Sequence, residues 1–164
     1  CGYHLKSHGR PVGIKIDSLA IPLITSTSSV KGFEADFTRV IREELMRHSE
    51  IPIVTKEKAE AILTGRIYEI DYVPLAYNTM KRTVSGRTIT HQTTSSRRLI
   101  LKLDIYLTDK TSGKVIWHDN SMEEDARFEV GNDPLSNRHN QQEALKKIAG
   151  LLAKRIYLKT MERF

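Results

Sequence analysis

The side chains with the most chemical potential in this sequence are one cysteine, six histidines and a run of carboxylates. Cysteine occurs only at position 1, so neither an internal disulfide nor a zinc site of paired thiolates can form. The histidines are scattered, and the two that lie four residues apart, His4 and His8, lie in a stretch without helical periodicity. The carboxylates of MEEDARFE (122–129) do not follow the spacing of a calcium loop. These patterns predict no metal site and no cofactor.

The sequence also lacks the motifs of the common enzyme classes. It contains no GxxxxGK[ST] phosphate loop, no GxSxG elbow, no HExxH and no dinucleotide glycine fingerprint. The single glycine of TSGKV (111–115) is typical of a turn. A catalytic cysteine needs a nearby base and a supporting pocket, which an N-terminal stretch does not supply. The sequence therefore predicts a protein that is not an enzyme.

Cys1 has a different interpretation as a point of lipid attachment. A cysteine followed by the small Gly2 is what signal-peptide removal leaves in bacterial lipoproteins. A free thiol that falls there by chance is the alternative. Each buried CH₂ of an acyl chain contributes ~0.8 kcal/mol, and two or more chains anchor a protein stably. We expect Cys1 to carry lipid and residues 1–11 to be the tether.

Composition and length indicate one domain over residues 12–164. Apolar residues make up 39% and charged residues 28% of the 164 residues, which is ordinary for a globular fold. The longest apolar run, LAIPLI, is far shorter than the ~18 residues of a membrane helix and contains Pro22. We expect no membrane-spanning helix.

Hydrophobic periodicity predicts the order strand, helix, strands, helix. Apolar residues recur at helical spacing over 31–48, and again from about Arg138 onward. Alternating or β-branched stretches predict strands at 12–24, 51–55, 60–73, 99–107 and 115–128, with loops at 25–29 and 129–137. Two amphipathic helices must cover one apolar face of a sheet. The expected fold class is α+β in two layers, with two amphipathic helices packed on one face of a mostly antiparallel four- to five-stranded sheet.

The formal charge of +6 comes from one segment. No Asp or Glu occurs between Tyr72 and Leu103, whereas six cations do: Lys81, Arg82, Arg87, Arg97, Arg98 and Lys102. Removing these six from the 26 basic residues leaves 20, which the 20 acidic residues balance. The Thr- and Ser-rich stretch 78–98 is expected to be a long polar connection, either a solvated loop or a surface for a polyanion. Nucleic acid fits the charge, but phosphates of anionic lipid or glycolipid fit an exported, tethered protein better.

Several stretches together resemble the LptE family of lipopolysaccharide-assembly lipoproteins. The order and spacing of CGYHL, FTRVIREELMRH, AEAILTGRIYEID, LILKLDIYLTDKTSGKVIWH and NQQEALKKIAGLLAKRI match over nearly the whole chain. The resemblance implies a monomeric lipoprotein of the Gram-negative outer membrane, held on the periplasmic side by acyl chains on Cys1. It also implies a 1:1 complex in which the chain plugs and helps assemble the LptD β-barrel and contacts lipopolysaccharide during its insertion into the outer leaflet. Nucleic acid is not among the implied partners.

The resemblance also assigns residues. Basic positions between the two long strands and before the last helix are associated with lipopolysaccharide contact in the family. The corresponding candidates are Lys81, Arg82, Arg87, Arg97, Arg98 and Arg138, with Arg87 and Arg138 as the best matches and Arg82 as a rival to Arg87. Two alternatives stay open. A periplasmic lipoprotein that activates a cell-wall synthase shares the tether and the α+β body, and a small nucleic-acid-binding module shares the basic segment.

Overall fold

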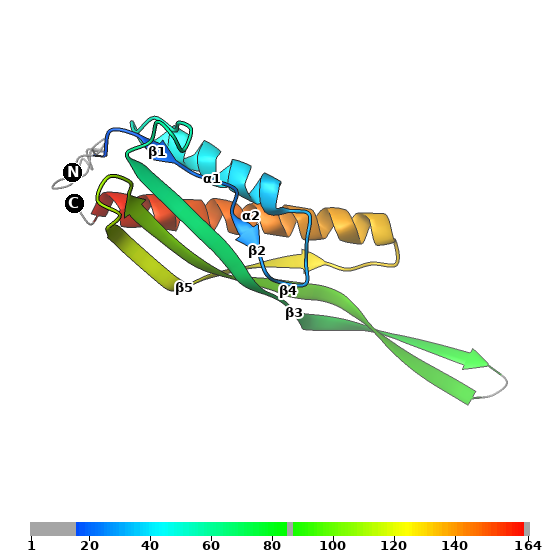
Figure 1. The fold of residues 1–164 in the computed structure, drawn as a ribbon. Coiled ribbons are helices and arrows are strands. Elements are labelled where there is room, and N and C mark those ends of the chain that lie inside the picture. The colour runs from blue at the N-terminus through cyan, green and yellow to red at the C-terminus, as the bar shows by residue number, and fades with distance from the viewer. Residues whose placement is uncertain (1–15, 85–86, 163–164) are drawn as a thin grey trace, which may run out of the picture.

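The computed structural model describes residues 16–84 and 87–162. Its elements are, in chain order, β1 (Leu19–Ala20), β2 (Thr25–Ser26), α1 (Glu34–His48), β3 (Ala61–Val84), β4 (Arg87–Asp109), β5 (Val115–Glu129) and α2 (Pro134–Glu162) (Figure 1). The tether expected over residues 1–11 lies outside the described residues, and so does the start of the strand expected over 12–24.

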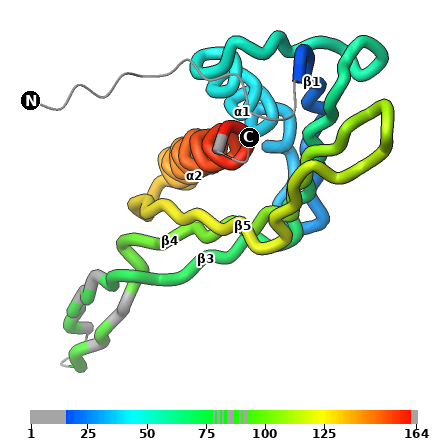
Figure 2. The backbone as a smooth tube through the Cα atoms, turned by 90° about the vertical axis from the view of Figure 1, so that its left-hand side faces the viewer, coloured from blue at the N-terminus to red at the C-terminus, as the bar shows by residue number. Residues whose placement is uncertain are grey.

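The sheet has five strands in the order β1-β3-β4-β5, with β2 also pairing with β3. β3, β4 and β5 are antiparallel neighbours, whereas β1 and β2 run parallel to β3. Both helices lie on the same side of this sheet (Figure 2), and α1 packs beside α2. The expected two-layer α+β fold is confirmed.

The core lies between the sheet and the helix pair. Alternate residues of β4 are fully buried, namely Leu99, Leu101, Leu103, Ile105 and Leu107. The helices meet them with the apolar stripes that their spacing predicts, including Phe37, Ile41 and Leu45 of α1 and Ile148, Leu152 and Ile156 of α2. One continuous core therefore holds the two layers together.

A β-bulge in β3 explains why its sequence alternates poorly. Leu63 and Ile67 are buried, but a register shift between Ile67 and Glu69 makes Ile70 the next buried residue. A bulge adds one residue to a strand and so reverses which side chains face the core. Simple alternation along 60–73 would place Ile62, Ile70 and Tyr72 on one face, and the bulge instead separates Ile62 from the other two.

The N-terminal strands are shorter than expected. Within the described part of 12–24 only Leu19–Ala20 is strand, and Thr25–Ser26 pairs with β3 inside the segment expected to be a loop. The strand expected over 51–55 is a single bridge between Leu19 and Ile53. Pro22 and Pro52 interrupt these stretches because proline has no N–H for a ladder.

The segment expected to be a long polar connection is instead strand. β3 continues to Val84 and β4 starts at Arg87, and β5 pairs with β4 only from Ser96 onward. Residues 75–84 and 87–95 therefore form a two-stranded ribbon that projects from the body (Figure 1). Threonine is β-branched and enriched in strands, so the error was to interpret a Thr-rich stretch as a connection because it is polar. We call this hairpin extension the ribbon.

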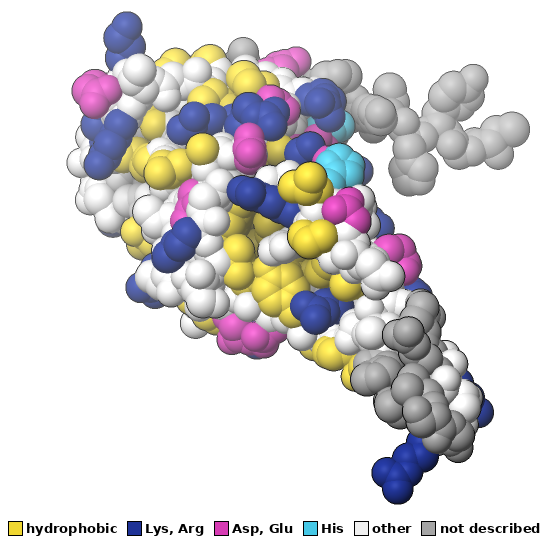
Figure 3. Space-filling model, turned by 90° about the vertical axis from the view of Figure 1, so that its right-hand side faces the viewer, with side chains coloured by type: hydrophobic (Ala, Val, Ile, Leu, Met, Phe, Trp, Pro, Cys, Tyr) yellow, Lys and Arg dark blue, Asp and Glu magenta, His cyan; other side chains and the backbone are white. Residues whose placement is uncertain are grey.

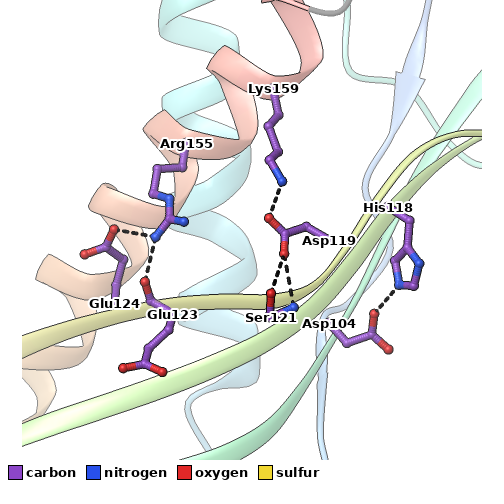
Figure 4. A network of polar contacts seen from close by, with 8 residues as sticks. All are labelled: Asp104, His118, Asp119, Ser121, Glu123, Glu124, Arg155 and Lys159. Carbon is purple, nitrogen blue, oxygen red and sulfur yellow. Dashed lines mark hydrogen bonds and ion pairs between the residues drawn. The ribbon is translucent and has the colours of Figure 1, made fainter.

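Polar contacts fasten α2 to β5 (Figure 4). The Arg155 guanidinium donates to the Glu123 carbonyl (2.6 Å) and to the Glu124 carboxylate (2.9 Å), and Lys159 donates to Asp119. Burial opposes ionisation of Asp119, but the hydrogen bond and charge of Lys159 outweigh it, so the pKa of Asp119 is lowered. Neither helix, as far as the described residues go, is long and apolar enough to cross a membrane.

Candidate functional site

A groove of about 470 Å³ opens between the first turns of α2 and the sheet. Its lining comes from four elements and the β5–α2 connection: Tyr72, Arg97, Phe128, Val130, Pro134, Asn137, Arg138 and Gln141. We call it the basic groove. Two of the predicted cations, Arg97 and Arg138, meet here although 41 positions separate them in the sequence.

The wall of the basic groove is aromatic. The rings of Tyr72 and Phe128 meet edge to face with centroids 6.2 Å apart. The Gln141 side-chain amide on α2 donates a hydrogen bond to the Tyr72 hydroxyl on β3 and so bridges the two layers. The groove therefore offers an apolar surface together with a fixed polar contact.

The two arginines bring positive charge to this apolar surface. Within the described residues, neither Arg97 nor Arg138 forms an ion pair with a carboxylate. Arg97 is half-buried and Arg138 is exposed. Burial raises the pKa of the Tyr72 phenol, whereas the hydrogen bond from Gln141 and the positive charge of Arg97 act in the opposite direction. Arg97 is thus close enough to Tyr72 to act on the same part of the groove.

The start of α2 positions Arg138. The helix begins at Pro134, earlier than the expected start near Arg138. The Asp133 carboxylate accepts the backbone N–H groups of Leu135 (3.2 Å) and Ser136 (3.0 Å), and proline suits the first helical position. Hydrogen bonds from Ser136 and from these amides lower the pKa of Asp133. The sequence DPLS contains this signal, so the earlier start was predictable.

The other predicted cations lie elsewhere. Arg98 follows Arg97 on β4 and so points to the opposite face of the sheet, where it pairs in register with Arg127. Lys81 and Arg87 are exposed on the ribbon. Arg87 and Arg97 are ten residue steps apart along β4, which is roughly 33 Å at the usual rise. The backbone of Arg82 pairs with Ile89 in the ribbon, but the structure does not describe the Arg82 side chain. Cys1, the predicted lipid-attachment residue, lies outside the described residues.

Figure 3 views the end of the molecule from which the ribbon projects. Hydrophobic side chains gather in the middle of this face, and Lys and Arg side chains lie around them. The sequence did not single out Tyr72, Phe128 or Gln141 as site residues. Only the alternation of β5, which puts Phe128 on the buried face, offered a signal for one of them.

Comparison with known proteins places this chain in a family. Residues 16–160 match the family described as LptE: Lipopolysaccharide-assembly. The chain belongs to the LptE family. The resemblance seen in the sequence is therefore confirmed over nearly the whole chain. No curated protein matches the chain at a significant level.

Solved structures support the fold of this LptE family member. Lipoprotein B from Nitrosomonas europaea, described as uncharacterized, is similar with a TM-score of 0.51 and 16% identity, covering 98% of this chain and 91% of that one. A minor lipoprotein from Acinetobacter baumannii is similar with a TM-score of 0.50 and 12% identity, covering 89% and 91%. At such low identity the likeness concerns the fold alone.

The chemistry available in the basic groove is that of binding. The guanidinium groups of Arg97 and Arg138, which pair with no carboxylate in the described part of the chain, can hold a phosphate through charge-assisted hydrogen bonds. The aromatic wall can cover an apolar part of the same ligand. No group of three His, Cys, Asp or Glu side chains that could hold a metal occurs in the described ranges.

Proposed function

We propose that this LptE family member is an outer-membrane lipoprotein, anchored on the periplasmic side through Cys1, that contacts lipopolysaccharide while it is inserted into the outer leaflet. In this proposal the chain is a monomer that plugs and helps assemble the LptD β-barrel in a 1:1 complex. It acts without catalysis and without a cofactor. The observation that carries the proposal is the basic groove, where Arg97 and Arg138 lie beside an aromatic wall.

A phosphorylated glycolipid matches both properties of the groove. Its phosphates meet the arginines, and its apolar part meets Tyr72 and Phe128. An exposed arginine–phosphate contact contributes ~1 kcal/mol or less in water, because solvent and salt screen the charges. A barrel interior that excludes water would strengthen the same contacts. Single substitutions should therefore weaken lipopolysaccharide binding only slightly in the isolated chain, whereas reversing several of these charges together should weaken it strongly.

The first experiment measures binding of purified chain to lipopolysaccharide at two salt concentrations. The Arg97→Glu/Arg138→Glu variant should bind about tenfold or more weakly, since two attractive contacts become repulsive. The matched control is Lys81→Glu/Arg87→Glu, which makes the same charge change on the ribbon. The control should bind nearly as well as the wild type, and the difference should shrink at high salt.

The results separate three interpretations of the charge. Equal loss in both variants would show that net charge, and not the groove, determines binding. Weaker binding only in the Lys81→Glu/Arg87→Glu variant would show that lipopolysaccharide contacts Lys81 and Arg87 and not the basic groove. Wild-type binding by a variant with Arg82, Arg87, Arg97, Arg98 and Arg138 all reversed would defeat the proposal for lipopolysaccharide.

Partner and tether are tested separately. Co-purification from membranes should recover an LptD β-barrel protein with the wild type and with the groove variant, because plugging depends on shape and a wide surface. Recovery of a peptidoglycan synthase instead would support the cell-wall alternative, and recovery of nucleic acid would support the nucleic-acid-binding alternative. Cys1→Ser should release a folded body from the membrane fraction. Mass spectrometry that finds unmodified Cys1 in native chain would end the tether hypothesis.

A further inference from the structure

The ribbon exposes a regular strand edge on its β4 side. Residues 87–94 of β4 pair with residues 77–84 of β3 in unbroken register. β5 joins β4 only from Ser96 onward, and the last hydrogen bond on that side runs from the Val130 N–H to the Ser95 carbonyl. In the part of the chain that the structure describes, no strand lies on the outer side of residues 87–94. We call these residues the β4 edge.

Prolines and bulges are the usual means by which proteins prevent a strand edge from pairing. In the described hairpin they lie at the base of the ribbon: Pro74 has no N–H to donate, and the register shifts beside Ala76 add Leu75 to β3 and Ser95 to β4. Further out, residues 87–94 contain no proline and no bulge. The β4 edge is therefore regular. It presents N–H and C=O groups on every second residue over roughly 27 Å.

The ribbon also lacks the support that the rest of the sheet has. Both helices cover the body, and the ribbon extends away from them (Figure 1). A two-stranded hairpin is marginally stable in water, whereas three strands can be stable. A strand added at the β4 edge would lie in line with β5 and give the ribbon a third strand.

Charge indicates which kind of strand fits. Lys81 and Arg87 are exposed on the ribbon, and no Asp or Glu occurs between Tyr72 and Leu103. A second copy of the chain would bring a ribbon of the same positive charge, with no Asp or Glu between its Tyr72 and Leu103 to attract Lys81 and Arg87, which opposes pairing. A segment that carries Asp and Glu would be attracted by the same cations.

We propose that the β4 edge binds an extended acidic segment of a protein partner as an added β-strand. This proposal goes beyond lipopolysaccharide contact, and it rests on the proposed function only in naming the LptD barrel as the partner that supplies the segment. Main-chain hydrogen bonds hold the segment, and Lys81 and Arg87 select its charge.

The first test follows backbone amides by nuclear magnetic resonance in the whole chain. The probe is a synthetic peptide in which Glu alternates with Val, and its control carries Lys in place of each Glu. The Glu peptide should slow hydrogen exchange at every second amide of residues 87–94, and the Lys peptide should not. Equal effects of both peptides, or no slowing with either, would overturn the proposal.

The second test uses proline to remove one N–H at a time. Thr90 and Thr93 are both exposed, and the offset between them is three, which is odd, so one N–H points to β3 and the other points outward. The outward proline should keep the ribbon's own amide protection and abolish the effect of the Glu peptide. The inward proline should remove a hydrogen bond between β3 and β4 and open the ribbon. It is the control that shows how amide exchange changes when the ribbon itself is lost. Wild-type peptide binding by the outward variant would refute strand addition.

The third test uses the complex with the barrel. Amides at 87–94 should exchange more slowly in the co-purified complex than in the free chain. Unchanged exchange in a complex that does form would overturn the strand proposal and leave the proposed function intact. Failure to co-purify would defeat the barrel as partner, whereas the peptide result would still decide whether the edge binds an acidic strand.

Discussion

Alanine at Gly65 should destabilise the protein, because the chain between β1 and β2 passes directly over this residue. A Cβ at Gly65 would lie 3.3 and 3.4 Å from two carbons of Ile24 and 3.5 Å from the Cδ1 of Leu103. Ile24 is fully buried. Its N–H donates to the Thr38 hydroxyl of α1 at 2.9 Å, so it cannot easily move away.

Two opposing contributions set the size of the effect. Alanine in a strand is favoured over glycine by roughly 0.5–1 kcal/mol, since glycine loses more backbone entropy on folding. Crowding a packed core costs ~1–3 kcal/mol. We expect Gly65→Ala to lower the free energy of unfolding by about 1 kcal/mol and Gly65→Val to lower it by ~2–3 kcal/mol, because valine adds more atoms to the same space.

Urea unfolding of a double-mutant cycle provides the assay. Ile24→Val alone should cost roughly 0.5–1.5 kcal/mol, but with alanine at Gly65 it makes room for the new methyl group. The double variant should therefore be more stable than the sum of the singles predicts. Gly150 in α2 is the matched control, since a Cβ there would meet nothing within 4 Å. Gly150→Ala should stabilise the helix by up to ~1 kcal/mol. Additive effects in the cycle, or equal stabilisation at both glycines, would refute the crowding argument.

Three further predictions concern other parts of the fold. Lys159→Met should cost about 0.5–1 kcal/mol at pH 7, because solvent screens the partly exposed lysine. The folded pKa of Asp119 is lowered, so this stability is present above the unfolded pKa and is lost as pH falls through the folded pKa, and urea midpoints of variant and wild type should converge in that acid range. Asp133→Ala should fray the start of α2 and weaken lipopolysaccharide binding through Arg138, whereas Asp133→Asn should preserve both in circular dichroism and binding assays. Phe37→Ala should cost ~3–5 kcal/mol in urea unfolding, and near-wild-type stability would contradict its place in the core.

The body of the fold was predictable because its elements bury one face. The central part of β4 alternates Leu101, Leu103 and Ile105 with Lys102 and Asp104, and α1 places Phe37 and Ile41 at helical spacing. Such patterns reflect burial, and burial fixes the layer arrangement. No helix of the described chain covers a face of the ribbon, so its sequence contains no clear alternation that could distinguish it from a loop. Its threonines were the one signal of strand structure.

The basic groove was only partly predictable. The charge pattern identified Arg97 and Arg98 together, but adjacent strand residues point to opposite faces, and only the pairing of β4 with β5 shows which face meets α2. Arg138 was identified through the resemblance to the family. Its meeting with Arg97 depends on where α2 begins and on the packing of α2 against the sheet, which are tertiary properties.

The bulge in β3 decides whether this groove can bind an amphiphile at all. Up to Ile67 the odd-numbered residues of β3 face the core. Without the shift between Ile67 and Glu69, the same alternation would turn Asp71 toward the helices and Tyr72 toward solvent. A carboxylate would then face Arg97 and Arg138, neutralise part of their charge and replace the aromatic wall. The inserted residue instead directs Tyr72 into the groove, so that among the described residues no carboxylate pairs with either arginine and both can meet an anionic ligand.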